Sequence, residues 1–333
     1  MRHTALLGLL FLLGACGSKD TKQKQLPASK GLVSELLVVC DPELLQSDLH
    51  DSILLITEGQ MPGLGADEMI FRTNNLTPRA LTPAFEMMHS QVIFHVDARL
   101  QRPRLAVAYN VKAQPQIQVH VTAPDHKSMR RWLSEQREAI QWLLLDFQAE
   151  RMAASLRRQG EFSPKVYQEL QSTAGYSIQV PAVLTATKRE KDFLWGSTNR
   201  NVEDMNFLYY SFPWDGQPLS IDVFADKRDS VLQKNIPGST GQQWMATARG
   251  LENRPAIIER NLRMKGETVK EMRGLWALHG GFMGGPFVAL AHTDTLARRI
   301  LVFEGFVYNP NAQKRDLMRQ LEGALRTARR KNK

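Results

Sequence analysis

The longest periodic stretch of the chain runs from Lys127 to Arg158, and it restricts the fold more than any other feature. Apolar residues recur in it at spacings of three and four: Met129, Trp132, Leu133, Ile140, Leu143, Leu144 and Phe147. This spacing is typical of an α-helix with one apolar face, and Gly160 follows as a stop signal. The sequence therefore predicts a long helix that buries this face against other elements.

Runs typical of β-strands lie on both sides of this helix. They are Glu35–Cys40, Gln91–Val96, Gln116–Val121, Tyr176–Val180, Phe207–Phe212, Ile257–Met264, Phe287–Ala291 and Ile300–Tyr308. Two more helices are expected, over Ser220–Asn235, with Ser220 as N-cap and Pro237-Gly238 as terminator, and over Gln313–Arg330. Because clusters of strands are each followed by a long helix, we predict an α+β protein with antiparallel or mixed sheets and long packing helices.

The chain is long enough for two lobes, each with its own core. About 300 of the 333 residues follow the amino-terminal segment, and domains of 100 to 200 residues are the usual size. We expect a first α+β lobe over residues 33–160 and a second over residues 175–333, with the boundary between Gly160 and Gly175.

The first fifteen residues have the pattern of a secretory signal. Arg2 precedes an apolar run from Ala5 to Leu13, and small residues follow it. The run is typical of a signal peptide and too short to span a bilayer. Leu13-Gly14-Ala15-Cys16 resembles the bacterial lipobox, in which the signal is cleaved before an acylated cysteine. We therefore expect a signal peptide over residues 1–15 and lipid attachment, with chains such as palmitate, at Cys16.

The residues after Cys16 predict a tether. Residues 16–32 are polar and contain four lysines, Pro27 and Gly31, a composition that favours a flexible segment. We expect the body to lie outside the bilayer, anchored to the outer membrane on its periplasmic face. Some surface-exposed lipoproteins carry an export signal of several acidic residues close behind the cysteine. Lys19-Asp20 matches this signal in only one residue, Asp20. Cys40 lies in an apolar run and is expected to be a small buried side chain.

Basic residues gather at the end of the chain. The formal net charge is +9, and it falls to +8 when Arg2 leaves with the signal; the last 21 residues hold eight basic residues against two acidic ones. We expect a solvated helix end, which suits cations near a helix carboxyl terminus. An anionic envelope polymer or lipid, or an envelope protein, is the alternative partner. Export argues against nucleic acid.

The glycine-rich stretch from His279 to His292, HGGFMGGPFVALAH, is the segment that most resembles a ligand loop. A phosphate-binding loop requires a lysine after its glycines and then a helix. The glycine fingerprint of a dinucleotide-binding site also stands at the start of a helix. Here a strand-like run follows Gly284-Gly285-Pro286, without a lysine. We therefore expect no nucleotide cofactor, and we interpret the glycines as close-packed or positive-φ backbone at a sheet bend.

Catalytic motifs give weak signals. The sequence has neither a Gly-x-Ser-x-Gly elbow nor a His-Glu-x-x-His pair, and its histidines are scattered, so no metal is expected. A serine triad assembled from distant residues stays open. Asp222, Asp226 and Asp229 fall on one helix face, where they form either a wet surface or a set of acid/base groups.

Four blocks of sequence resemble an uncharacterised lipoprotein family of the Bacteroidota, domain of unknown function 4837. They are KRDSVLQKNIPG (residues 227–238), MGGPFV (283–288), EGFVYNPNAQKRDLMRQLE (304–322) and the opening ELLVVCD (35–41). The resemblance spans most of the mature chain and is weakest around Pro62–Phe71. It implies an exported, lipid-anchored envelope protein, and it carries over no catalytic residue.

The resemblance marks seven motif positions, which are Arg228, Asp229, Pro237, Gly238, Gly284, Gly285 and Pro286. Pro237-Gly238 ends a helix, and the other glycines and Pro286 bend a strand. Arg228 and Asp229 suggest an ion pair or hydrogen-bond network between helix and sheet, since a planar guanidinium suits a carboxylate.

These observations predict a non-enzymatic binding or assembly module in the cell envelope. One alternative is an envelope hydrolase that uses the three aspartates, which requires a pocket where they converge. The other is a solute-binding lipoprotein, which requires a deep cleft between two lobes. The aromatic run LYYSFPW (residues 208–214) either lines a groove or packs in the core.

Overall fold

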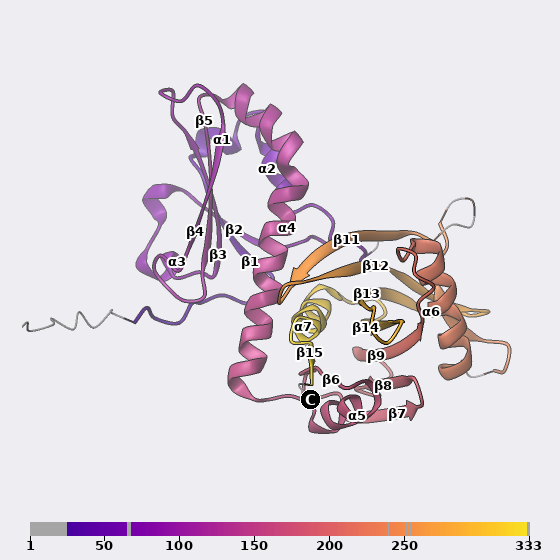
Figure 1. The fold of residues 1–333 in the computed structure, drawn as a ribbon. Coiled ribbons are helices and arrows are strands. Elements are labelled where there is room, and N and C mark those ends of the chain that lie inside the picture. The colour runs from indigo at the N-terminus through magenta and orange to yellow at the C-terminus, as the bar shows by residue number, and fades with distance from the viewer. Residues whose placement is uncertain (1–24, 65–67, 239, 251, 253–254, 332–333) are drawn as a thin grey trace, which may run out of the picture.

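The computed structural model describes residues 25–331 except for 65–67, 239, 251 and 253–254. The α+β class and the mixed and antiparallel sheets predicted from the sequence are confirmed. One sheet and its helices form the upper part of Figure 1, and a larger curled sheet forms the lower part. The expected signal peptide and Cys16 lie outside the described residues. None of the described helices is long and apolar enough to cross a membrane.

The first sheet is mainly parallel. Its strand order is β2 (Arg72–Leu76), β1 (Glu35–Val39), β3 (Ser90–Val96), β5 (Ile117–Ala123) and β4 (Arg104–Tyr109). Only β4 runs antiparallel to its neighbour. Short helices α1 (Pro42–Leu45), α2 (His50–Thr57), η1 (Pro78–Ala80) and α3 (Pro83–Glu86) connect the strands. Buried β1 residues of one parity face the main core, and those of the other parity face the segment around α3.

Residues near the end of the predicted tether pair with this first lobe. Ser29 donates its amide hydrogen to the carbonyl of Gln114, and Gln114 donates to the carbonyl of Pro27. Lys30 is paired in the same way with Met87 and His89. The chain is therefore fixed from Pro27 onward, five residues before the expected end of the tether.

The long helix α4 runs from His126 to Gln159 and confirms the main sequence prediction. Asp125 caps its start by accepting from the Ser128 amide, and Gly160, with φ 68°, ends it in the left-handed conformation. Its apolar face covers the first sheet beside α2, and its second half packs on α7 (Arg315–Leu325). Gly323 makes that contact close, because a Cβ there would lie 2.3 Å from the Cβ of Met152. One helix thus joins both lobes (Figure 1).

The segment expected to separate the lobes contains a helix, α5 (Pro164–Ala174). The Ser163 hydroxyl caps its start, and Gly175 ends it with φ 67°. It packs on β6 (Tyr176–Ser177), β7 (Ala186–Glu190) and β8 (Phe193–Ser197). The boundary region therefore belongs structurally to the second sheet and its helices.

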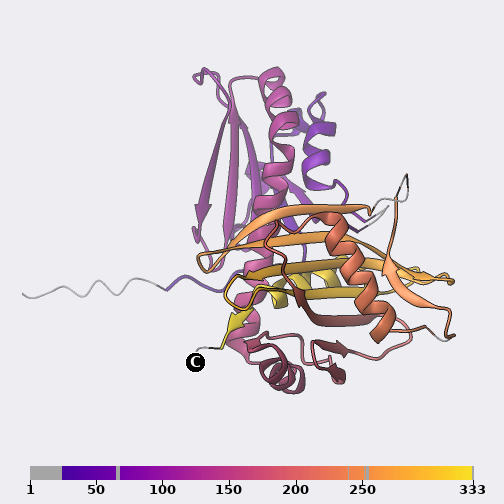
Figure 2. The same cartoon turned by 45° about the vertical axis from the view of Figure 1, so that its right-hand side comes forward.

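The second sheet is antiparallel and curls into half of a barrel. Its order is β10 (Trp244–Thr247), β12 (Glu267–His279), β13 (Gly284–Asp294), β14 (Arg299–Tyr308), β9 (Asp204–Pro213), β8 and β7, and β11 (Ile257–Met264) also pairs with β12. Alternate residues of β14 pack into two different cores. Leu301 and Phe303 face α7, whereas Ile300 and Val302 face α6 (Ile221–Asn235). Figure 2 shows α6 lying across one face of this sheet.

The carboxy-terminal helix differs from its prediction. α7 ends at Leu325, and Arg329–Arg330 form a short strand, β15, which pairs with β6. The predicted strand over Tyr176–Val180 is accordingly reduced to Tyr176–Ser177. The expectation of a solvated basic helix end is wrong for α7, because Arg315, Arg319 and Arg326 are buried.

Carboxylates pair with two of these buried arginines, one carboxylate from α7 itself and one from α4. Arg319 donates to Glu322 at 2.7 Å, and Arg326 donates to Asp146 of α4 at 2.6 Å. Glu322 also accepts from Arg273 of β12. Buried charges are retained in proteins when they are paired in this way. Arg329, Arg330 and Lys331 are the described basic residues of this stretch that stay exposed.

Candidate functional site

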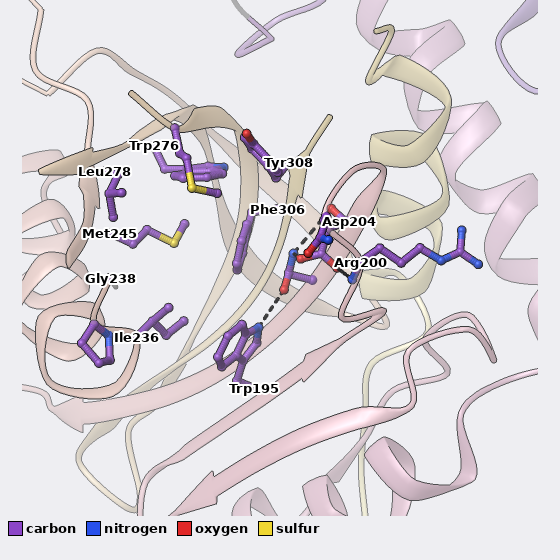
Figure 3. Close-up of a pocket in the computed structure, with 14 residues that line it drawn as sticks. Trp195, Arg200, Asp204, Ile236, Gly238, Met245, Trp276, Leu278, Phe306 and Tyr308 are labelled. Carbon is purple, nitrogen blue, oxygen red and sulfur yellow. Dashed lines mark hydrogen bonds between the residues drawn. The ribbon is translucent and has the colours of Figure 1, made fainter. Parts of the chain in front are cut away.

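An apolar pocket of about 460 Å³ lies in the second lobe, beside the end of α6. Figure 3 shows the labelled residues around it, which come from β8, β9, β10, β12 and β14, from the segment between β8 and β9 and from the segment after α6. Its lining consists of Trp195, Arg200, Asn201, Asp204, Asn206, Ile236, Pro237, Gly238, Met245, Trp276, Leu278, Met283, Phe306 and Tyr308. Small-molecule sites in proteins are typically concave, apolar and of this size.

Aromatic rings form one wall of the pocket. Trp276 of β12 meets Phe306 of β14 edge-on, with ring centroids 5.6 Å apart, and lies 6.2 Å from the ring of Tyr308. The Trp276 indole N–H donates to the carbonyl of Val307 at 3.3 Å, so the ring is held from behind. Met245, which is 2% exposed, fills the space toward α6. The wall is therefore preformed by packed residues.

A fixed polar edge faces this wall. Trp195 donates its indole N–H to Asn206 Oδ1 at 2.8 Å, and Asn206 donates from Nδ2 to Asp204 Oδ2 at 2.9 Å (Figure 3). The hydroxyl groups of Ser197 and Thr198 donate to Asp204 Oδ1 at 3.0 and 2.6 Å. These bonds use both carboxylate oxygens of Asp204. Asp204 therefore holds the segment between β8 and β9 in place and, through Asn206, orients the Trp195 ring.

Pro237 and Gly238, two of the motif positions, close another side. Ser220 caps α6 as predicted, by accepting from the Val223 amide, and the helix ends at Asn235 before Ile236 and this pair. The Gly238 amide donates to the Gln243 carbonyl at 2.7 Å. A Cβ at Gly238 would lie 2.5 Å from the Cβ of Gln243. Glycine therefore allows the chain to turn tightly at the wall of the pocket.

Gly284, Gly285 and Pro286 lie at the start of β13, paired with Ala277, Trp276 and Leu275 of β12. A Cβ at Gly285 would lie 2.1 Å from the Val307 carbonyl oxygen and 3.0 Å from the Trp276 indole nitrogen. The structural role of Gly285 is thus close approach of backbone behind the aromatic wall. The positive φ expected somewhere in this glycine stretch is found at Gly280, with φ 69°.

Arg228 and Asp229, the remaining motif positions, form a network between helix and sheet. Arg228 binds Glu304 of β14 through Nε and Nη2, at 3.0 and 2.7 Å, and donates from Nη1 to the Thr247 hydroxyl at 3.1 Å. Asp229 accepts from the Thr247 amide at 2.6 Å and from Arg249 at 2.9 Å. These bonds fix α6 and β10, and thereby the pocket wall that follows α6.

The three aspartates of α6 do not converge on this pocket. Asp222 and Asp226 are exposed, and Asp226 and Asp229 both bind Arg249, at 3.2 and 2.9 Å. The acid/base arrangement that the hydrolase alternative requires is therefore contradicted. Among the described residues, no group of three histidine, cysteine, aspartate or glutamate side chains is placed to hold a metal ion.

Cys40 and two histidines are buried. Burial, together with Asp41, raises the pKa of Cys40 to about 11, which keeps the thiol protonated and unreactive. Burial is also the main cause that lowers the pKa of His89 and of His292 to about 4. His89 contacts Ser90 and the Leu32 carbonyl, whereas neither ring nitrogen of His292 has a hydrogen-bond partner within the described parts of the chain.

A second hollow, of about 380 Å³, lies where the lobes meet. It is lined by residues 60–63, by α4 and by Ile258 of β11. The Arg260 guanidinium covers the ring of Trp142 there, 3.8 Å from its centroid. The solute-binding alternative requires a deep cleft between the two lobes. The hollow found there is more polar than the first pocket and lacks its aromatic wall, so this alternative has weaker support.

Most of the pocket was missed by sequence reasoning. Trp195, Asn206 and Trp276 carry no motif, and β12, which holds Trp276, was not expected as a strand. The signals were the glycine stretch and Pro237-Gly238, which mark the backbone around the pocket, and the block at residues 304–322, which contains Phe306 and Tyr308. From the run at residues 208–214, Tyr209 and Tyr210 pack in the two cores instead of lining the pocket.

Comparison with known families divides the chain between the end of α4 and the start of α5. Residues 163–327 match the family described as "Domain of unknown function (DUF4837)", and residues 29–157 match "Domain of unknown function (DUF8532)". None of the curated proteins matches the chain. The opening block at residues 35–41 falls in the second of these matches, so the first family does not span most of the chain. Residues 163–327, which hold the pocket and its motif positions, are thus similar to domain of unknown function 4837, and residues 29–157 before them are similar to a different domain of unknown function.

Proposed function

We propose that this protein is a non-enzymatic binding module of the cell envelope, whose second lobe holds the apolar part of a small amphiphilic ligand. The observation that carries the proposal is the pocket of about 460 Å³ with an aromatic wall and a polar edge. The wall offers area for burial of an apolar body, and the exposed residues Arg200 and Asn201, which also line the pocket, suit a polar head.

The packing around the pocket supports binding as its use. Gly238 and Gly285 permit backbone approaches that any side chain would block, and Arg228 anchors the helix that precedes the wall. Asp204 is engaged by Ser197, Thr198 and Asn206, so the pocket's one lining carboxylate serves as a brace. A preformed cavity of this kind lowers the entropic cost of binding.

A neutral apolar fluorophore, N-phenyl-1-naphthylamine, tests the pocket directly. We expect its fluorescence to rise on addition of the protein, and Leu278→Glu to weaken its binding about tenfold, because a carboxylate in the wall opposes apolar burial. Val223→Glu is the matched control, since Val223 is 44% exposed and lies outside the pocket. Equal binding by both variants and the unaltered protein would refute the proposal.

We also propose that the chain is exported and anchored to the outer membrane, facing the periplasm, through acyl chains on Cys16. The support is the sequence Leu13-Gly14-Ala15-Cys16 behind a short apolar run. In cells fed a palmitate analogue, we expect the protein to be labelled and to enter the detergent phase on detergent partition. Cys16→Ser should abolish both. Cys40→Ser is the control, and label retained by Cys16→Ser would show that the anchor is elsewhere or absent.

A further inference from the structure

A polar groove lies where the β11–β12 turn meets the carboxy-terminal strand β15. Two adjoining hollows, of about 300 and 460 Å³, share Tyr176, Glu267, His292 and Arg330 in their lining. The larger hollow adds Lys265, Arg329 and Lys331. We refer to these seven residues as the carboxy-terminal groove. It has no residue in common with the aromatic pocket, so it calls for a separate explanation.

Cations without an acidic partner gather in this groove. Arg330 is paired with Asp294 at 2.8 Å, but within the described part of the chain Lys265, Arg329 and Lys331 form no ion pair. The position of Lys265 is set by a two-residue turn in which Lys265 and Gly266 both have positive φ, 49° and 87°. Its Nζ donates to the Ala328 carbonyl at 2.6 Å. Burial, and then Arg329 and Arg157, lower the pKa of Lys265, against smaller opposing effects of Glu150 and Glu267.

The floor of the groove holds hydrogen-bonding groups that are not used. His292 is 7% exposed, and neither of its ring nitrogens has a partner among the residues described. Its ring lies 5.9 Å from that of Tyr176 and 5.4 Å from that of Phe303. Burial, and then Lys265, lower the pKa of His292, so at neutral pH the imidazole offers one donor and one acceptor.

Besides Asp294, which is paired with Arg330, Glu267 is an acid that lies among these groups. Its Oε2 is 3.9 Å from Nδ1 of His292, which is too long for a hydrogen bond, and its side chain is 69% exposed. A carboxylate so exposed can rotate away. Its present place, beside an unpaired imidazole and within two residues of Lys265, is one to which neighbouring cations would attract an external anion.

We propose that the carboxy-terminal groove binds a phosphate group, and that the Glu267 carboxylate covers this site until the phosphate displaces it. A phosphate carries up to two charges and several acceptor oxygens, so it can accept from Lys265, Arg329 and the floor at the same time. The single charge of Glu267 leaves the cations undercompensated. The site is independent of the apolar ligand proposed above.

Two probes separate the sources of such a phosphate. Glycerol 3-phosphate, followed by titration calorimetry, represents a soluble phosphorylated compound. Sedimentation with phosphatidylcholine vesicles, with and without phosphatidylglycerol, represents a lipid headgroup. Every protein carries Cys16→Ser, so that an acyl anchor does not contribute, and thermal denaturation checks that each variant is folded.

We expect Arg329→Gln and Lys265→Gln each to weaken phosphate binding about tenfold, because each removes a charge-assisted contact. Glu267→Gln should strengthen it severalfold, because it removes the competing charge. Lys227→Gln, an exposed lysine of α6 outside the groove, is the control for net charge.

This pattern with glycerol 3-phosphate assigns the site to a soluble phosphate, and the same pattern with phosphatidylglycerol vesicles alone assigns it to a lipid. Failure of both probes to bind overturns the proposal. So does a loss in Lys227→Gln equal to that in Arg329→Gln, or an unchanged or weaker affinity in Glu267→Gln.

Discussion

Arg228 of α6 and Glu304 of β14 form a two-pronged ion pair in which both side chains are 0% exposed. The guanidinium also lies over the ring of Phe287, 4.1 Å from its centroid, and the Tyr210 hydroxyl donates to Glu304 at 3.3 Å. The helix beside the pocket is thus attached to the centre of the sheet by a charge pair rather than by apolar packing alone.

Removing one partner of this pair leaves a buried charge without compensation. We expect Arg228→Met to lower the free energy of unfolding by about 3 to 5 kcal/mol, and Glu304→Gln to lower it by a similar amount. The double variant Arg228→Met/Glu304→Gln should lose less than the sum, because no unpaired charge remains. Urea denaturation measures all three. Additive losses would show that the two side chains do not act as a pair.

Gly285 is expected to be intolerant of any side chain. Gly285→Ala places a Cβ against the Val307 carbonyl and the Trp276 indole, so it should destabilise the protein by about 2 to 3 kcal/mol and weaken binding of the apolar fluorophore. Gly241→Ala is the control, since a Cβ there meets nothing within 4 Å. Thermal denaturation compares the two. A Gly285→Ala protein as stable as Gly241→Ala would mean that β13 and β14 are less closely apposed than described.

Stability should decrease on acidification between about pH 6.5 and 4. Burial lowers the pKa of His89 and His292 from 6.5 to about 4, so in this window the unfolded chain binds protons that the folded chain does not. The free energy of unfolding is therefore highest above 6.5, the pKa of these histidines in the unfolded chain. It falls as the pH is lowered toward 4, by roughly 3 kcal/mol for each histidine. Urea denaturation at pH 7, 5.5 and 4 measures the slope. His292→Leu should remove about half of it, and an unchanged slope would assign the effect to other groups.

Asp146 joins α4 to the second lobe. It accepts from Arg260 of β11 at 2.7 and 2.8 Å and from Arg326 at 2.6 Å. Because its side chain is 36% exposed, we expect Asp146→Asn to cost only about 1 to 3 kcal/mol, measured by urea denaturation. Glu135→Gln, in an exposed pair with Arg131 on the same helix, should cost less than about 0.5 kcal/mol. A similar loss in both would indicate a general effect of charge on α4.

Local patterns were sufficient to place several elements. The apolar spacing and Gly160 predict α4, and Ser220 predicts the start of α6, because helix periodicity and capping depend on residues a few positions apart. The strand predicted over Ile257–Met264 coincides with β11. The motif blocks of the second lobe also led to the family that residues 163–327 match.

The elements that were missed owe their form to residues distant in the sequence. β12 was not expected as a strand; it contains Glu271 and Arg273, and both are buried because Arg260 of β11 and Glu322 of α7 complete their charge pairs. The last helix ends early because β15 pairs with β6, more than 150 residues away. The charge of a residue in the sequence therefore did not indicate whether its side chain is exposed.

The sequence alone determined the helix and strand periods, the caps and the backbone positions where only glycine fits, since these are fixed by neighbouring residues. The tertiary structure decided which charges are buried and where a ligand fits. Trp195, Trp276 and Phe306 form one pocket only because the sheet curls and brings three separate strands together. The crowding of Lys265, Arg329 and Lys331 depends in the same way on strand pairing across the lobe, because the energy of such contacts depends on distance in space, not along the chain.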